Sequence, residues 1–109
     1  MEHINRIELA GRVGTIRLNE YGGQKVANFS VITELFFKRM DGSVISESTW
    51  HNVTAWESPT VPDLTNLQKG AAVKISGRLR NSRYTSADGT EKTYIEVLAS
   101  SLKILPREG

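Results

Sequence analysis

The sequence contains no cysteine, which excludes disulfide frameworks, thiolate zinc sites and cysteine nucleophiles. It has no long apolar run, so we expect no transmembrane helix. The first six residues, Met-Glu-His-Ile-Asn-Arg, lack the apolar core of a signal peptide, and the expected location is therefore cytoplasmic. With two histidines and no HExxH, P-loop or GxSxG motif, the sequence indicates neither an enzyme nor a protein with a bound cofactor or metal.

What is present is typical of one globular domain. The chain has 109 residues, of which 39% are hydrophobic and 24% are charged. We predict a single domain over residues 1–105, followed by a short polar C-terminal end over residues 106–109. The formal net charge of +2 is too small to indicate a nucleic-acid partner by itself.

Glycine-containing turn signals divide the chain into extended segments. Gly22-Gly23, Asp41-Gly42 and Asp88-Gly89 each lie between runs rich in β-branched and aromatic residues, as in β-hairpins. One short helix is expected within residues 61–70, because Pro62 suits a first turn and Gly70 suits a helix end. The predicted strands are Ile4–Leu18, Val26–Lys38, Val44–Trp56, Ala72–Tyr84 and Thr93–Leu105.

Five long strands with one short helix between the third and the fourth favour a small barrel. Gly11, Gly14 and Gly77 lie inside strands, where they allow a strand to bend and serve two sides of a barrel. The apolar alternation of the first strand changes parity at Gly14-Thr15, which predicts a β-bulge there. We therefore predict an all-β, five-stranded OB-fold barrel, with an SH3-like barrel or a small sandwich as alternatives.

The alternation of side chains in the third strand separates two faces. Thr49, His51, Val53 and Ala55 share one face, and Trp50, Asn52, Thr54 and Trp56 share the other. Large aromatics on a polar face have two explanations. Either they pack under a loop, the helix or another subunit, or they form a platform on which nucleic-acid bases stack.

The fourth strand combines a core face with a basic face. Val73, Ile75, Gly77 and Leu79 are expected in the core, and Lys74, Ser76, Arg78, Arg80, Ser82 and Tyr84 lie opposite. From Lys69 to Tyr84 there are five basic residues and no acidic one, which leaves nine basic against 12 acidic residues elsewhere. A basic strand beside exposed aromatics favours binding of single-stranded nucleic acid, with phosphates held by Lys69, Lys74, Arg78, Arg80 and Arg83.

Several stretches, in this order and spacing, make the chain resemble the bacterial single-stranded DNA-binding proteins. They are Asn5 to Gly14, Val26 to Val31, Thr49-Trp50-His51-Asn52-Val53, Lys69-Gly70, Gly77-Arg78-Leu79-Arg80 with Tyr84, and Tyr94-Ile95-Glu96-Val97. The resemblance implies an OB fold that assembles, usually as a homotetramer, and wraps single-stranded DNA in replication, recombination and repair. It implies stacking residues at Phe37, Trp50, Trp56 and Tyr84, phosphate contacts at Lys69, Arg80 and Arg83, and a subunit contact at His51.

Among the departures of the sequence from the family, two bear on DNA affinity and on partners. The family commonly has tryptophan at the positions of Phe37 and Tyr84 and phenylalanine at that of Trp56, so a lower affinity per base is expected. The family's disordered linker and acidic tail, which recruits replication and repair enzymes, do not follow Gly109 here, so tail-mediated partners are not predicted. Either the sequence is trimmed or it is a short paralogue from a mobile element.

Three alternatives compete with single-stranded DNA binding. Stacking does not distinguish ribose from deoxyribose, so RNA is a close rival as the ligand. An accessory module of the primosome type would use the aromatic face to bind protein. The third alternative is an enzyme, but the sequence contains no candidate nucleophile, metal cluster or acid–base pair. For the oligomeric state, a dimer is also compatible with the pattern.

Overall fold

Five long strands and one short helical turn make up the computed structural model, which describes residues 1–61 and 64–106. The elements follow the chain as β1 (Ile7–Tyr21), β2 (Gln24–Lys38), β3 (Val44–Trp56), η1 (Leu64–Asn66), β4 (Ala72–Thr85) and β5 (Glu91–Ile104). All five predicted strands are present, with ends displaced by up to three residues. Among the described residues, no helix combines the length and apolar character needed to span a membrane.

The strands form a closed barrel in the order β1-β2-β3-β5-β4. β1 closes it, because residues 7–12 pair with β4 and residues 12–21 pair with β2. The register of the β1–β2 pair shifts between Val13 and Ile16, which confirms the bulge predicted at Gly14-Thr15. A second shift occurs in the β4–β5 pair between Ser76 and Gly77. The predicted five-stranded barrel is therefore confirmed.

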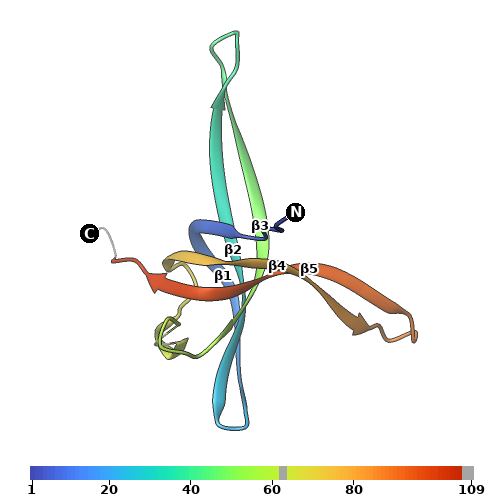
Figure 1. Ribbon diagram of the computed structural model, residues 1–109. Helices are drawn as coiled ribbons and strands as arrows, with labels where there is room; N and C mark the ends of the chain where they lie inside the picture. The colour runs from blue at the N-terminus through green and yellow to red at the C-terminus, as the bar shows by residue number, and fades with distance from the viewer. Residues whose placement is uncertain (62–63, 107–109) are drawn as a thin grey trace.

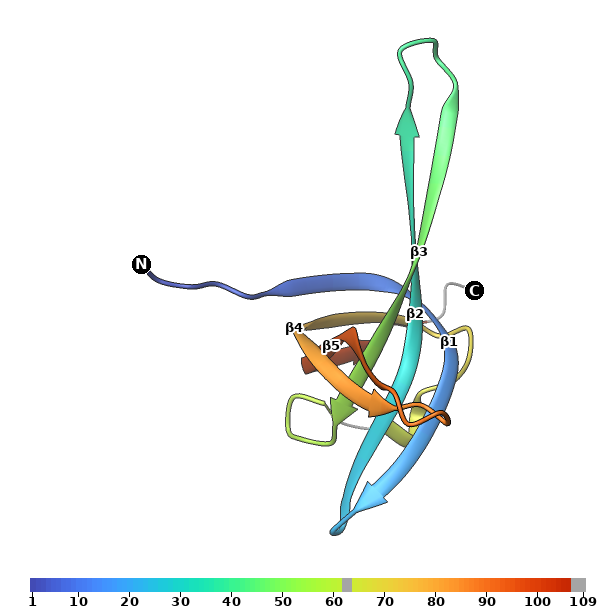
Figure 2. The same cartoon turned by 90° about the vertical axis from the view of Figure 1, so that its right-hand side faces the viewer.

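Three hairpins extend the strands beyond the barrel wall (Figure 1). The β2–β3 arm is the longest of them in the view, and its ladder continues without interruption from Val26–Trp56 to Lys38–Val44. The β1–β2 turn uses Gly22 and Gly23 at φ of 60° and 82°, a backbone region that glycine enters without strain. The N-terminal residues before β1 run away from the barrel (Figure 2).

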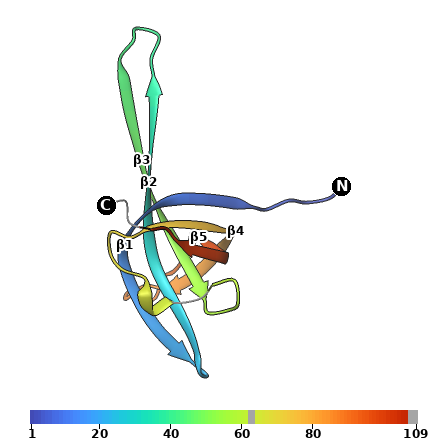
Figure 3. The same cartoon turned by 90° about the vertical axis from the view of Figure 1, so that its left-hand side faces the viewer.

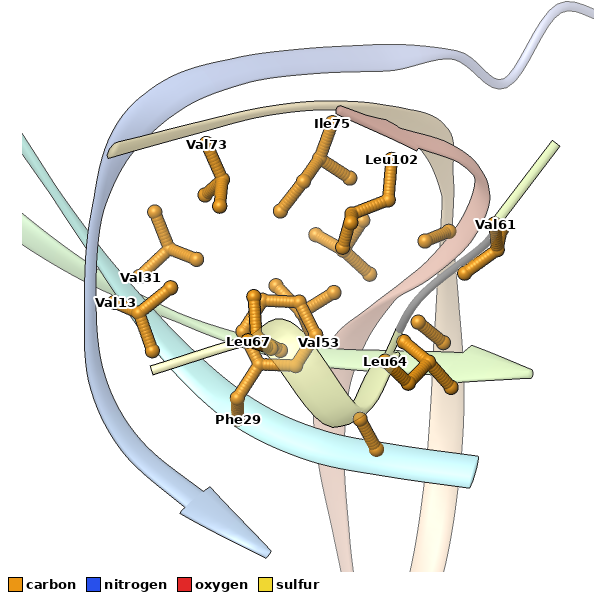
Figure 4. Close-up of a cluster of buried hydrophobic side chains, with 14 of the residues drawn as sticks. Val13, Phe29, Val31, Val53, Val61, Leu64, Leu67, Val73, Ile75 and Leu102 are labelled. Atoms are coloured by element: carbon orange, nitrogen blue, oxygen red, sulfur yellow. The ribbon is translucent and has the colours of Figure 1, made fainter. Parts of the chain in front are cut away.

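The core fills the barrel with branched aliphatic side chains and one aromatic, Phe29 (Figure 4). Val73, Ile75 and Val31 are completely buried. Leu79, predicted in the core with them, is 42% exposed, and that prediction is wrong. The reason is topological: β1 pairs with β4 only as far as Gly77, so Leu79 lies beyond the barrel wall on the β4–β5 arm.

The predicted helix is confirmed in place but is shorter than residues 61–70. It is one 3-10 turn, η1, and it lies on the side of the barrel away from the β2–β3 arm (Figure 3). Leu64 and Leu67, three residues apart, both enter the core. Pro62, expected in its first turn, and residues 107–109 of the polar end lie outside the described residues.

Candidate nucleic-acid interface

The outer face of the barrel carries a polar groove between β1, β2, β3 and β5. We call it the central groove; it holds about 500 Å³ and is lined by Thr15, Ile16, Arg17, Asn28, Phe29, Ser30, Asn52, Val53, Thr54, Tyr94 and Glu96. Cross-strand pairing brings these residues together, because Arg17 pairs with Asn28 and Asn28 pairs with Thr54. The groove has the volume of an ordinary small-ligand site and is lined largely by hydrogen-bonding groups.

Both tryptophans border this groove along β3. The outward row of the strand reads Trp50, Asn52, Thr54 and Trp56, so the indoles flank the two polar residues of the groove. The predicted assignment of the tryptophans to the polar face is therefore confirmed. Their surroundings differ: Trp50 is 60% exposed, whereas Trp56 is partly buried.

Trp56 packs against the barrel as well as facing solvent. Its ring lies 6.2 Å, centroid to centroid, from that of Tyr21, with an angle of 49° between the planes. Its cross-strand partner Val26 is buried although it does not belong to the core cluster. Trp56 and Tyr21 thus form an aromatic pair on the outer face, and packing accounts for part of the Trp56 surface.

On the far side of the groove, β5 contributes an aromatic residue that the sequence analysis missed as a stacking candidate. Tyr94 is 38% exposed and lines the groove, and its ring centroid lies 5.8 Å from that of Tyr84. Tyr84 is 48% exposed. The pairing of Ser82 with Tyr94 places both tyrosines on one face, and this register cannot be read from local sequence.

Phe37 lies on the β2–β3 arm, on the other face of the ladder from Trp50. Trp50 pairs with Ile32, and alternation along β2 then puts Phe36 on the face of Trp50. Phe37 pairs with Ile45 and is 45% exposed, and Phe36 is 68% exposed. The structure therefore leaves both phenylalanine rings open to solvent, on opposite sides of the arm.

The five cations from Lys69 to Arg83 do not form one surface. Lys74, Arg78 and Arg80 share a face of β4, whereas Arg83 alternates onto the opposite face. Lys69 lies in the loop before β4 and lines a second hollow together with Arg12. All five are exposed.

Arg80 differs from the other cations because its partner is buried. Its Nε donates a hydrogen bond of 2.7 Å to Oε1 of Glu96, whose side chain is 5% exposed. The Thr54 hydroxyl lies 2.9 Å from Glu96 Oε2 and 2.9 Å from Asn28 Oδ1, so the pair continues into the floor of the groove. Arg80 therefore neutralises a carboxylate beneath the groove.

Arg17 is the cation of the central groove that the sequence analysis did not single out. It lies on β1 after the bulge, outside the basic segment from Lys69 to Tyr84. The parity change at Gly14-Thr15 was a signal for its position, because it places Arg17 on the outer face beside Asn28. The bulge thus adds a cation to the groove.

His51 lies on the same face of β3 as the buried residues Val53 and Ala55, at the base of the β2–β3 arm. Its Nε2 is 3.0 Å from the hydroxyl of Thr33, and the residue is partly buried. This burial lowers the pKa of the imidazole below its usual value, which favours the neutral ring at physiological pH.

Comparison with known proteins agrees with this geometry. The model of the single-strand binding protein family matches residues 4–105. A single-stranded DNA-binding protein of Neisseria meningitidis serogroup A is 31% identical over 104 residues, which cover 94% of this chain and 60% of the relative. Single-stranded DNA-binding protein 2 of Chlorobaculum tepidum is 28% identical over 108 residues, covering 96% of this chain and 73% of the relative.

Solved structures show the same fold. The Plasmodium falciparum SSB in complex with ssDNA superposes with a TM-score of 0.77 at 30% identity, covering 97% of this chain and 98% of that one. A deletion mutant of the single-stranded DNA binding protein from Thermus aquaticus gives a TM-score of 0.73 at 20% identity, over 94% of this chain and 51% of that one. The predicted OB-fold class is confirmed. The chain belongs to the single-strand binding protein family.

Proposed function

We propose that the chain binds single-stranded DNA without sequence preference and protects it in replication, recombination and repair. The observation that carries this proposal is the 60% exposed Trp50 ring beside a polar groove on the outer face of the barrel. An exposed indole offers a flat surface to any base, and stacking of this kind contributes roughly 1–3 kcal/mol per base. The match to the family over residues 4–105 supports the same conclusion.

In the proposed mechanism, bases stack while cations neutralise phosphates. Trp50, Trp56, Phe37 and Tyr84 are the proposed stacking residues, and Tyr94 joins them because it lines the central groove. Lys69, Lys74, Arg78 and Arg83 are proposed to contact phosphates, with Arg17 inside the groove. Arg80 has a mixed role, because its guanidinium is already ion-paired with Glu96. The mechanism needs no catalytic step, and we propose that the chain is not an enzyme.

The assembly and location belong to the same proposal. We infer a homotetramer in the cytoplasm. We place His51 at a contact between copies, because this partly buried residue lies on the inward-facing side of β3 at the point where the strand passes into the exposed arm. Light scattering of the free protein tests the tetramer against a dimer. A monomer at micromolar concentration would contradict the assembly and leave DNA binding to be judged separately.

Tryptophan fluorescence during titration with oligo-dT tests the proposed function. We expect strong quenching at low salt and a steep loss of affinity as salt rises, because phosphate contacts release counterions. The absence of quenching at low salt would refute the proposal. A parallel titration with oligo-U separates the ligands: equal affinity for both would assign the chain to single-stranded nucleic acids in general.

A further inference from the structure

The bulge in β1 lies directly beneath the Trp50 ring. Gly14 and Thr15 of β1 stand opposite the single residue Ser30 of β2, because Val13 pairs with Val31 and Ile16 with Phe29. The backbone N–H of Thr15 donates a hydrogen bond of 2.9 Å to Ser30 Oγ. The side chain of Ser30 therefore satisfies a donor that the bulge removes from the ladder.

The Trp50 side chain reaches from β3 across β2 to this bulge. A β carbon placed on Gly14 would lie 2.5 Å from Cζ3 and 3.0 Å from Cη2 of the Trp50 indole, and 2.7 Å from Ser30 Oγ. Real β carbons do not approach other atoms so closely, so the indole occupies space that only glycine leaves empty. Gly14 is itself buried, although Trp50 is 60% exposed.

The need for glycine at position 14 comes from neighbouring side chains, foremost the Trp50 indole, rather than from the backbone conformation. Gly14 is not among the glycines with positive φ, which are Gly22, Gly23, Gly42, Gly70 and Gly89. Alanine is therefore compatible with the backbone at position 14, and its methyl group would meet side-chain atoms of Trp50 and Ser30. Gly11 differs, because a β carbon there would meet the backbone carbonyl of Ile32.

We propose that Gly14 is a positioning residue for single-stranded DNA binding: the bulge forms a seat without a β carbon that holds the Trp50 indole in one orientation. This inference rests on the proposed function, in which Trp50 stacks on bases. A ring that is oriented before binding loses less conformational entropy when a base stacks on it. The bulge thus fixes the orientation of the exposed indole in addition to bending the strand.

The Gly14→Ala variant tests the seat in the free protein first. Because the sequence has two tryptophans, the Trp56→Phe background leaves Trp50 as the only indole. We expect Trp56→Phe to show an indole signal in near-ultraviolet circular dichroism and Gly14→Ala in that background to lose most of it. An unchanged signal would overturn the proposal. This measurement contains no DNA, so it stays decisive even if the wild type fails to bind oligo-dT.

Affinity for oligo-dT provides the second measurement. Gly14→Ala should weaken binding by about 2- to 10-fold, the range expected from immobilising one side chain on binding. Trp50→Phe keeps an aromatic ring but removes Cζ3 and Cη2, the two indole atoms that the alanine methyl group would meet. In the Trp50→Phe background, Gly14→Ala should therefore change the affinity for oligo-dT by less than 2-fold. An equal loss in both backgrounds would show that Gly14 acts independently of the indole.

Folding failure would also give an answer. If Gly14→Ala does not fold but Gly14→Ala with Trp50→Phe does, the conflict between the methyl group and the indole is established. If neither folds, the bulge requires glycine for a reason other than the indole, such as the close approach of Ser30 Oγ, and the seat is refuted. Thermal unfolding followed by far-ultraviolet circular dichroism distinguishes the two results.

Discussion

The strands β2 and β3 run through both the barrel and the β2–β3 arm, yet the two regions differ in what covers these strands. In the barrel half, Phe29, Val31, Val53 and Ala55 are buried. In the arm half, residues 34–38 and 44–50 are all exposed, although the ladder is continuous. The comparison teaches that strand pairing does not bury side chains here; burial begins where β1, β4, β5 and η1 close around the ladder.

The arm therefore presents apolar side chains that the barrel would bury. Leu35, Phe36, Phe37, Val44 and Ile45 are between 37% and 68% exposed. Exposed apolar groups contribute little to folding, so we expect the arm to open locally at a lower free energy than the barrel.

The largest effect is expected for matched isoleucines in the two regions. Ile75 is completely buried in the barrel and Ile45 is 37% exposed on the arm. Ile75→Ala should lower the free energy of unfolding by about 2–5 kcal/mol, because it leaves a cavity, and Ile45→Ala should change it by no more than about 0.5 kcal/mol. Urea denaturation measures both, and similar losses would mean that the arm is packed in solution.

Two ion pairs extend the comparison to charges. Arg80 pairs with Glu96, which is 5% exposed at the base of the β4–β5 arm, whereas Arg83 and Glu91 further out on that arm are 76% and 61% exposed. Arg80→Ala should lower the free energy of unfolding by about 1–3 kcal/mol, because it leaves the buried carboxylate of Glu96 without its ion-pair partner. Arg83→Ala should cost less than about 0.5 kcal/mol. If Arg80→Ala unfolds in urea like the wild type, Glu96 has found another partner or water.

Trp50 should affect binding rather than stability. Trp50→Ala is expected to weaken oligo-dT binding by about 1–3 kcal/mol, because it removes one stacking surface. The unfolding midpoint should stay close to that of the wild type, since the ring is 60% exposed. Fluorescence of a labelled oligonucleotide measures the affinity. Arg78→Ala is the matched control: it should reduce the slope of log affinity against log salt by about 1 without removing an aromatic surface.

The smallest effect is expected at the tip of the β4–β5 arm. Hydrogen bonds from Ser86, and from the backbone and side chain of Thr90, lower the pKa of Asp88 to about 2 from 3.8. Because the pKa is lower in the folded state, the stabilising contribution is complete above about pH 4 and is lost as pH falls through about 2. NMR titration of the carboxyl carbon checks this, and Ser86→Ala should move the midpoint upward. A wild-type midpoint near 3.8 would show that the turn is open in solution.

Local patterns allowed much of the fold to be predicted. The bulge at Gly14-Thr15 and the outward face of Trp50 and Trp56 both follow from alternation over a few residues. Leu79 shows where this reasoning ends: its parity predicts the core, but β1 ends its pairing at Gly77 and leaves it exposed. Alternation assigns a face and does not report how far the neighbouring strand extends.

The sequence by itself determined which residues turn, which extend and which face outward, because these depend on the backbone preferences and side-chain period of neighbouring residues. Only the tertiary structure decided which outward residues share a site. The insertion of β5 between β3 and β4 brings Tyr94 into the central groove and Glu96 beneath Arg80, and the fold of β1 across β2 puts Gly14 under Trp50. Contacts between residues so far apart in the chain depend on strand order and register, which local sequence does not encode.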